Sequence, residues 1–212
     1  MPINQLLVIV AAVLATVIAV AIGWRWVSRV WSMPCPSLFA WALESSFYSR
    51  LTGTDITLER IGLKPGQRVL EIGPGPGRLL IPAARRVLPG GEAVGIDIQP
   101  GMIDRLTRRA AQAGLTNLTA ILGDATQPLV PAESFDVAFL VTTLGEIPDR
   151  AGALQQCHRA LKPGGVLSVT ELLPDPHYQS RAKVRQLAEA AGFRFLSLQG
   201  GVVLFTMNFV KP

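Results

Sequence analysis

Short apolar runs alternate with longer stretches of helical periodicity over most of the chain beyond residue 61. Seven runs are rich in Val, Ile, Leu and Phe and have the length of strands, at 67–72, 92–97, 117–122, 135–141, 165–171, 193–198 and 202–209. Four stretches place apolar residues at helical spacing, at 78–88, 101–113, 150–161 and 179–191. Strands that alternate with helices predict an α/β fold, with a mostly parallel sheet covered on both faces.

Turn-forming residues support these boundaries. Pro100 suits the first turn of a helix and Gly114 its end, and Asp149 is a suitable N-cap for the helix after it. Gly200 and Gly201 form a glycine turn between the last two apolar runs. A tight turn of this kind joins antiparallel strands, so the last strand is predicted to run against the others.

The first 24 residues carry no charged side chain, and Leu6 to Gly23 is an apolar stretch whose one polar member is Thr16. As a helix, its 18 residues reach about 27 Å, close to the roughly 30 Å hydrocarbon core of a bilayer. A cleaved secretory signal carries basic residues before its apolar run, and a core helix of this length shows a polar stripe. Neither is present, so we predict a retained transmembrane anchor over residues 1–24.

The residues after this stretch predict its orientation. Arg25 and Arg29 follow it and no basic residue precedes it, so the positive-inside rule places residues 25–212 on the cytoplasmic side. Three tryptophans lie at the same boundary, where indole rings favour the headgroup region: Trp24, Trp26 and Trp31. The sequence therefore predicts a single-pass membrane protein whose folded domain faces the cytoplasm.

Composition limits the domain count and the partners. Without the first 24 of its 212 residues the chain keeps 188, enough for one well-buried core and too few for two ordinary domains. Its two cysteines, Cys35 and Cys157, fit a reducing compartment, and neither lies in a His/Cys cluster, so no metal site is predicted. The net charge of +5 comes from scattered pairs and not from a basic stripe with interleaved aromatics. We therefore predict no nucleic-acid partner, and attraction to anionic lipid headgroups instead.

The most informative motif is a glycine-rich loop after the first apolar run. Val69 to Arg78 reads VLEIGPGPGR, and Asp97 ends the next run 20 residues after Gly77. The glycines let the backbone turn tightly and approach a ligand that a Cβ would push away, while the following helix points unpaired N–H groups at that ligand. A dinucleotide fingerprint needs its third glycine at the position that Arg78 occupies. The loop therefore indicates a different nucleotide, one that carries an anionic or carboxylate group.

The stretch Glu71–Gly77 resembles the E/D-x-G-x-G-x-G motif of class I S-adenosylmethionine (SAM)-dependent methyltransferases. Four further segments match that family in order and spacing: VGID at 94–97, LGDA at 122–125, FDVAFLV at 135–141 and LKPGGVL at 161–167. The resemblance covers about Ile61 to Val210. It implies a Rossmann-like seven-stranded sheet in the order 3-2-1-4-5-7-6, with the last strand antiparallel, and SAM as the methyl donor.

The resemblance also implies which residues bind SAM. The loop and its helix terminus face the methionine carboxylate, Asp97 accepts hydrogen bonds from both ribose hydroxyls, and Asp124 accepts from the adenine amino group. The predicted cofactor-binding residues are Glu71, Gly73, Gly75, Gly77, Asp97, Ile98, Asp124, Ala125 and Val141. Each also has a purely structural interpretation, because tight turns need glycine and aspartates between strands and helices commonly serve as caps or turn residues.

Residues 25–60 form a juxtamembrane segment between the predicted anchor and the methyltransferase domain, 61–212. It is unusually apolar for a linker and is expected to be partly helical, with Leu38, Phe39, Trp41, Leu43, Phe47, Tyr48 and Leu51. Two compatible interpretations stay open. The segment is a helix that covers the sheet edge, or a lid over the donor pocket that admits apolar substrates from the membrane.

Transfer of a methyl group from a sulfonium is an in-line displacement, so alignment and exclusion of water supply much of the acceleration. A base is needed only where the acceptor must lose a proton. Polar residues gather where the fourth and fifth strands end, the edge at which open α/β sheets bind ligands: Thr142, Thr143, Glu146, Glu171, His177 and Tyr178. Of these, Glu146, His177 and Tyr178 are the predicted catalytic residues.

The acceptor is predicted to be a membrane-partitioned small molecule or lipid. Residues 135–149 are loosely similar to the ubiquinone/menaquinone methyltransferase family, and phospholipid amine methyltransferases resemble the chain in having a membrane-associated N-terminus. Two other functions stay open: an NAD(P)-dependent Rossmann oxidoreductase and a non-catalytic SAM-binding membrane protein. The first usually requires a Tyr-x-x-x-Lys motif, which Tyr178 does not begin.

Overall fold

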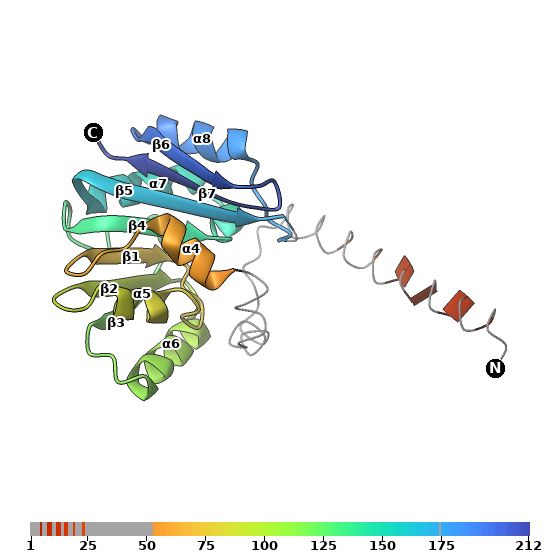
Figure 1. The fold of residues 1–212 in the computed structure, drawn as a ribbon, viewed down its shortest axis with the longest axis horizontal. Coiled ribbons are helices and arrows are strands. Elements are labelled where there is room, and N and C mark those ends of the chain that lie inside the picture. Colours follow the sequence, from red (N-terminus) through yellow and green to blue (C-terminus); the bar gives the residue numbers. More distant parts are fainter. Residues whose placement is uncertain are drawn as a thin grey trace.

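The computed structural model describes residues 53–173 and 175–212, with isolated positions between 5 and 23. These residues form one seven-stranded sheet in the order β3-β2-β1-β4-β5-β7-β6 (Figure 1). The strands are β1 (Arg68–Ile72), β2 (Glu92–Asp97), β3 (Leu118–Leu122), β4 (Phe135–Val141), β5 (Leu161–Leu172), β6 (Arg194–Gly200) and β7 (Leu204–Val210). The first five pair in parallel, and β7 runs antiparallel to both β5 and β6, so the predicted order and the reversed last strand are confirmed.

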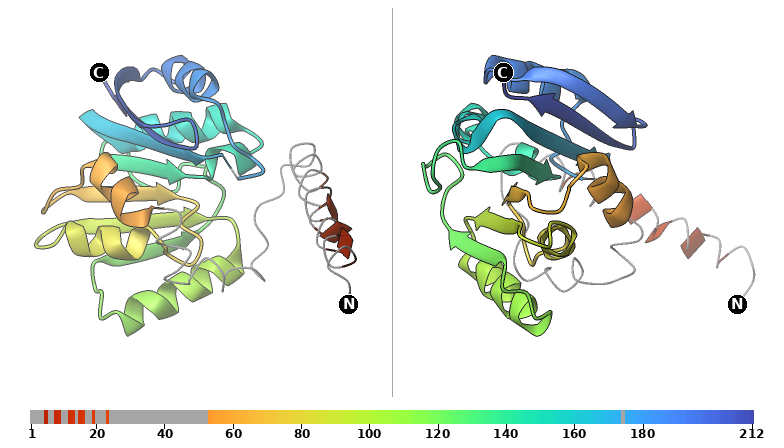
Figure 2. Two further views of the ribbon diagram at one scale, coloured as in Figure 1. Left: turned by 45° about the vertical axis from the view of Figure 1, so that its right-hand side comes forward. Right: turned by 60° about the vertical axis from the view of Figure 1, so that its left-hand side comes forward.

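Helices cover both faces of this sheet. One face carries α4 (Thr54–Ile61), α5 (Leu80–Arg86) and α6 (Pro100–Gln112), and the other carries α7 (Arg150–Ala160) and α8 (Arg181–Ala190) (Figures 1 and 2). The central strand β4 shows why. Val137 and Phe139 pack toward α4 and α5, while Ala138 and Leu140 pack toward α7 and α8. A parallel strand buried on both sides reads as a continuous apolar run, which is the pattern that the sequence shows.

The start of α7 agrees with the sequence prediction, whereas the start of β5 does not. The Asp149 side chain accepts a hydrogen bond from the Gly152 N–H at 2.9 Å, which fixes the start of α7. The fifth strand begins at Leu161, four residues before the predicted start. The reason is tertiary: Lys211 at the end of β7 exchanges backbone hydrogen bonds with Gly164 and Gly165, and so draws the Lys-Pro-Gly-Gly turn into the sheet.

Helix α4 is part of the packed domain although it lies within the predicted juxtamembrane segment. Leu58 and Ile61 are buried against α5 and the sheet, and the Asn208 amide in β7 donates to the Arg60 carbonyl at 2.9 Å. The Arg78 guanidinium donates to the Thr54 hydroxyl at 3.0 Å, so the start of α4 is tied to the glycine-rich loop.

The predicted anchor over 1–24, apart from isolated positions, and residues 25–52 of the predicted lid lie outside the described residues. Within the part of the chain that the structure does describe, no helix combines the length and apolar character that crossing a bilayer requires. The structure does define where the preceding chain meets the domain. Gly53, with φ of 64°, lies beside Leu204 at the start of β7.

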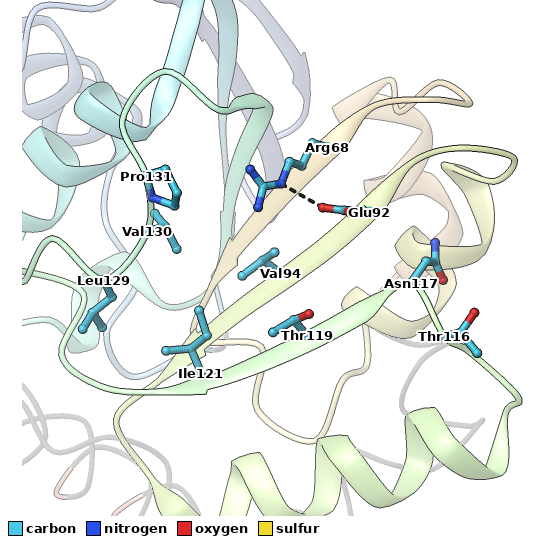
Figure 3. A pocket seen from close by; sticks show the side chains of 10 residues that line it. All are labelled: Arg68, Glu92, Val94, Thr116, Asn117, Thr119, Ile121, Leu129, Val130 and Pro131. Atoms are coloured by element: carbon cyan, nitrogen blue, oxygen red, sulfur yellow. Dashed lines mark ion pairs between the residues drawn. The ribbon is translucent and has the colours of Figure 1, made fainter.

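One face of β2 and β3 is only lightly covered, because residues 123–134 connect β3 to β4 without a helix. A hollow lies there, and Figure 3 shows its lining around the Arg68–Glu92 ion pair of 3.0 Å. Val94, Thr119 and Ile121 of the sheet face the β3–β4 connection across it. Since Arg68 and Glu92 begin their strands, this hollow extends toward the amino ends of the sheet.

The packing of α4 predicts a contrast between two apolar positions of one helix. Leu58 is 0% exposed and Ile56 is 48% exposed. Leu58→Ala is expected to lower the free energy of unfolding by about 2–4 kcal/mol because it leaves a cavity, and Ile56→Ala by less than about 1 kcal/mol. Denaturant titration followed by circular dichroism measures both. Equal and small losses would mean that α4 is not part of the folded core.

Candidate active site

The glycine-rich loop follows β1 and takes its shape from positive φ angles. Gly73 and Gly75 have φ of 68° and 53°, backbone angles that residues with a side chain rarely adopt. A Cβ on Gly73 would overlap the Thr143 side chain, whereas a Cβ on Gly75 would meet open space. Gly73 is thus required for the close approach of the loop to the end of β4. Gly75 instead leaves its surroundings free for a ligand.

Asp97 at the end of β2 holds this loop in place. Its Oδ2 accepts from the Gly75 N–H at 3.0 Å, and its Oδ1 accepts from the Gln99 N–H at 2.9 Å. The side chain is nearly buried, and burial raises the pKa of its carboxyl despite these backbone hydrogen bonds. A carboxylate can accept about four hydrogen bonds, so capacity for ribose hydroxyls remains.

Glu71 lies beside Asp97 and is buried in β1. Burial raises the pKa of its carboxyl well above the usual range, the Arg78 charge opposes this, and the Asp97 charge adds to it. Its Oε2 atom has no hydrogen-bond partner among the described residues. Buried polar atoms are normally satisfied, so this oxygen has unused capacity to accept a hydrogen bond beside the glycine-rich loop. The ammonium group of SAM is a donor of such a bond.

The other predicted cofactor residues line the same edge of the sheet. Ile98 directly follows Asp97 and is 58% exposed, which suits packing against a flat ring. Val141 ends β4 and is buried. Asp124 is exposed after β3, and its Oδ1 accepts from both the N–H and the hydroxyl of Thr126 at 2.9 Å, so it also stabilises its own turn. Ala125 packs against the core beside it.

The structure brings His177 and Glu146 together where β4 and β5 end. The His177 Nδ1 atom lies 3.9 Å from a Glu146 oxygen and 3.8 Å from an Asp175 oxygen. Asp175 also accepts from the His177 backbone N–H at 2.7 Å. A Cβ on Gly145 would overlap the His177 carbonyl, so a glycine at that position permits the two loops to meet.

Glu171 near the end of β5 lies under the same loop. Its Oε2 accepts from the Gln179 N–H at 3.1 Å, while its Oε1 is buried and has no partner among the described residues. Burial raises the pKa of Glu171 to about 8, against the hydrogen bond from Gln179, and the nearby Asp175 carboxylate raises it further. This carboxyl therefore changes protonation near neutral to mildly basic pH, as a general acid or base should.

Tyr178 lies apart from this cluster. Its hydroxyl donates to the Val202 carbonyl at 3.2 Å, and its ring meets Phe205 edge-on, with centroids 6.0 Å apart. Of the three predicted catalytic residues, the structure thus joins His177 and Glu146, whereas the Tyr178 hydroxyl bonds to the β6–β7 connection.

Sequence reasoning placed Glu171 at this edge without choosing it, and it missed Asp175 and Arg150. Arg150 donates to the carbonyls of Leu144 and Gly145 at 3.2 and 2.8 Å and so fixes the turn that carries Glu146. One signal was available for Glu171: a carboxylate inside an apolar strand of a covered sheet is rarely buried without a partner or a role. Nothing in the periodicity marks Arg150, since its role depends on loop geometry.

Two negative findings apply to the described residues. No group of three or more His, Cys, Asp or Glu side chains there could hold a metal ion. Cys157 is buried, and burial raises the pKa of its thiol to about 12, so it is an inert core residue.

The raised pKa of Glu171 predicts a pH-dependent stability. The folded protein holds this proton up to about pH 8, whereas the unfolded chain releases it near the ordinary value of 4.5. The folded state thus binds more protons between these values, and stability falls as pH rises through that window. Glu171→Gln is expected to reduce this fall by on the order of 2–4 kcal/mol. Urea titrations at pH 5 and pH 8 measure it, with the exposed Glu189→Gln as control; identical slopes would contradict the assignment.

Comparisons with known proteins agree with this geometry. A family model described as a methyltransferase domain matches residues 63–194. Nocamycin O-methyltransferase of Saccharothrix syringae is 38% identical over 119 residues, which are 56% of this chain and 42% of that protein. The ubiquinone/menaquinone biosynthesis C-methyltransferase of Ectopseudomonas mendocina is 34% identical over 148 residues, 69% of this chain and 56% of that protein. The chain thus spans about half the length of these relatives.

A solved structure shows the same fold. It is a SAM-dependent methyltransferase from Aquifex aeolicus, with a TM-score of 0.78 at 21% identity over 84% of this chain and 100% of that one. The family match covers more than half of the sequence and includes the glycine-rich loop, Asp97 and the His177 loop. The chain therefore belongs to the methyltransferase domain family, as a class I SAM-dependent methyltransferase domain.

Proposed function

We propose that this protein transfers the methyl group of SAM to a membrane-partitioned small molecule. The Asp97 carboxylate carries the donor half of the proposal, because it holds the glycine-rich loop open beside the unsatisfied Glu71 oxygen. When bound there, SAM supplies an electrophilic methyl group on a sulfonium. Family membership argues against the NAD(P)-dependent oxidoreductase, whose third loop glycine is replaced by Arg78.

The residues of the loop would orient the donor. Asp97 accepts from the ribose hydroxyls, Glu71 accepts from the ammonium group, and Ile98 contacts the adenine ring. The Asp97 carboxylate is held by the fold before any ligand arrives, since two backbone N–H groups already fix it. Preorganised positioning of this kind is the main contribution a protein makes to an in-line displacement.

The residues beyond β4 and β5 would handle the acceptor. Glu171 has a pKa of about 8, so its ionised form, whose population rises as pH approaches 8, can take the proton that a phenol or an activated ring carbon releases. His177 and Glu146 lie close enough to share a hydrogen bond through one bridging group and to position the acceptor oxygen. This division of roles requires both loops to meet, which Gly145 permits.

The acceptor class is proposed from the sequence and the relatives. The relatives include a ubiquinone/menaquinone biosynthesis C-methyltransferase and Nocamycin O-methyltransferase, which supports a ring carbon of a quinone-type acceptor or an acceptor oxygen. A phospholipid amine acceptor remains within the proposal. The apolar stretch 6–23 supports a single-pass anchor, and Arg25 and Arg29 support a cytoplasmic catalytic domain.

Donor binding depends on Asp97 in this proposal. Asp97→Asn replaces one accepting oxygen with an NH₂ group that faces the N–H of Gly75 or Gln99, so SAM affinity is expected to fall about 10- to 100-fold. Calorimetric titration of the purified chain with SAM measures this, and Asp104→Asn on the exposed face of α6 is the control. Unchanged affinity in Asp97→Asn would remove the residue from the donor site.

Transfer itself depends on the second cluster. With radiolabelled SAM and a membrane extract, His177→Ala and the more conservative His177→Gln are expected to lower methyl incorporation about 100-fold while SAM affinity stays nearly unchanged. SAM binding without incorporation by the unmodified protein would instead support the non-catalytic alternative. Activity confined to a water-soluble acceptor, and undiminished by deletion of residues 1–24, would contradict the membrane-partitioned substrate.

A further inference from the structure

The connection between β6 and β7 forms an apolar tip at the same end of the sheet as the candidate active site (Figure 1). Val202 and Val203 are 63% and 56% exposed. Two neighbouring side chains, Leu173 and Ile56, are also apolar and exposed. The Leu173 N–H donates to the Val203 carbonyl at 2.7 Å, and Ile56 of α4 lies beside Gly53 and Leu204. We call the surface formed by Ile56, Leu173, Val202 and Val203 the hairpin tip.

Two arginines flank the hairpin tip at Gly200, where β6 ends. A Cβ on Gly200 would lie 2.7 Å from Arg60 Nη1, and Arg181 Nη2 donates to the Gly200 carbonyl at 3.3 Å. The two side chains approach from opposite faces of the sheet. Arg60 belongs to α4, and the Asn208 side chain of β7 donates to its backbone carbonyl. Arg181 is the first residue of α8, and its guanidinium lies over the Phe205 ring.

Neither guanidinium is fully satisfied within the described residues. Arg60 Nη1 and Arg181 Nε are buried atoms without a hydrogen-bond partner there, and no described acidic side chain forms an ion pair with either arginine. The acid nearest to Ile56 in sequence, Asp55, is within 3.4 Å of Arg86. The two unpartnered arginine atoms are buried, so what a headgroup would meet is the positive charge of two half-buried side chains that no described acid neutralises. An apolar tip between two such cations matches the chemistry of a bilayer interface, where apolar side chains enter the acyl boundary and arginines snorkel toward phosphates.

The position of the tip along the chain favours lipid over other partners. Residues 1–52 precede Gly53, and they contain the apolar stretch 6–23. Gly53 meets the domain beside Leu204, so a chain anchored through that stretch would attach to the domain next to the hairpin tip. The attachment point and the tip also lie on the side of the sheet where the strands end at the His177 and Glu171 cluster (Figures 1 and 2).

We propose that the hairpin tip docks on the bilayer surface, with Val202 and Val203 inserted at the acyl boundary and Arg60 and Arg181 at the level of anionic headgroup phosphates. This orientation presents the ends of β4 and β5 to the membrane, and in that respect it deepens the proposed function, on which it rests for the nature of the substrate. The docking contact itself requires no methyl transfer.

The test places an environment-sensitive fluorophore on the full-length chain. Cys35→Ser leaves Cys157, which is buried, and Val203→Cys then provides one accessible thiol. The protein is mixed with phosphatidylcholine vesicles that either contain or lack phosphatidylglycerol, and vesicle-bound protein is recovered by flotation. In the bound fraction with phosphatidylglycerol, the label on Val203→Cys is expected to shift to the blue and to be quenched by lipids carrying a quencher in the acyl chain. Leu88→Cys is the matched control, since Leu88 is also apolar and 44% exposed but precedes β2, at the opposite end of the sheet.

The arginines provide a graded second measurement. Arg60→Gln and Arg181→Gln are each expected to lower the ratio of docked to undocked domain about fivefold on anionic vesicles, and to change it little on phosphatidylcholine alone. An unquenched label on Val203→Cys in the bound fraction, or failure of the chain to float with either vesicle, would overturn the inference. A blue shift that grows with protein concentration without lipid would overturn it too, in favour of contact between copies. Quenching without methyl transfer would retain docking and contradict the proposed function alone.

Discussion

The Asp97 carboxylate is the interaction on which the candidate site depends. It accepts from Gly75 on one side and from Gln99 on the other, so a single side chain sets the distance between the loop after β1 and the turn after β2. The pairing of β1 with β2 in parallel makes this possible, because both strands end at the same edge. The cost is a buried carboxyl beside the equally buried Glu71, and burial raises the pKa of both. A ligand that donates hydrogen bonds there offsets that cost.

The glycine-rich loop and the residues around His177 and Glu171 are linked through a series of contacts. Gly73 of the loop packs against Thr143, which precedes the short turn Leu144–Glu146, and Arg150 holds that turn through two carbonyls. Glu146 in turn lies within 3.9 Å of His177, whose loop covers Glu171. A displacement at any of these contacts would change the distance between the two halves of the site. A methyl transfer tolerates little such change, since the reacting atoms must be aligned.

The hairpin tip lies at the same end of the sheet as the candidate site (Figure 1). Helix α4 contacts the glycine-rich loop through the Arg78–Thr54 hydrogen bond, and it contacts β7 through Asn208, so it bridges the candidate site and the hairpin tip. The exposed apolar side chains of the hairpin tip therefore lie at that same end, with an arginine from α4 and another from α8 beside them.

The sequence by itself determined which segments form strands and helices and how they follow one another along the chain. Strands 92–97 and 135–141 and the glycine turn at Gly200 were read directly, because side-chain periodicity and backbone preferences act over a few residues. Tertiary structure alone decided the rest. Whether Glu171 titrates near 8, whether Tyr178 turns toward Val202 and whether β5 extends back to Leu161 all depend on partners 8 to 50 residues away in the chain. Burial and hydrogen-bond partners are properties of the assembled sheet, so no local pattern encodes them.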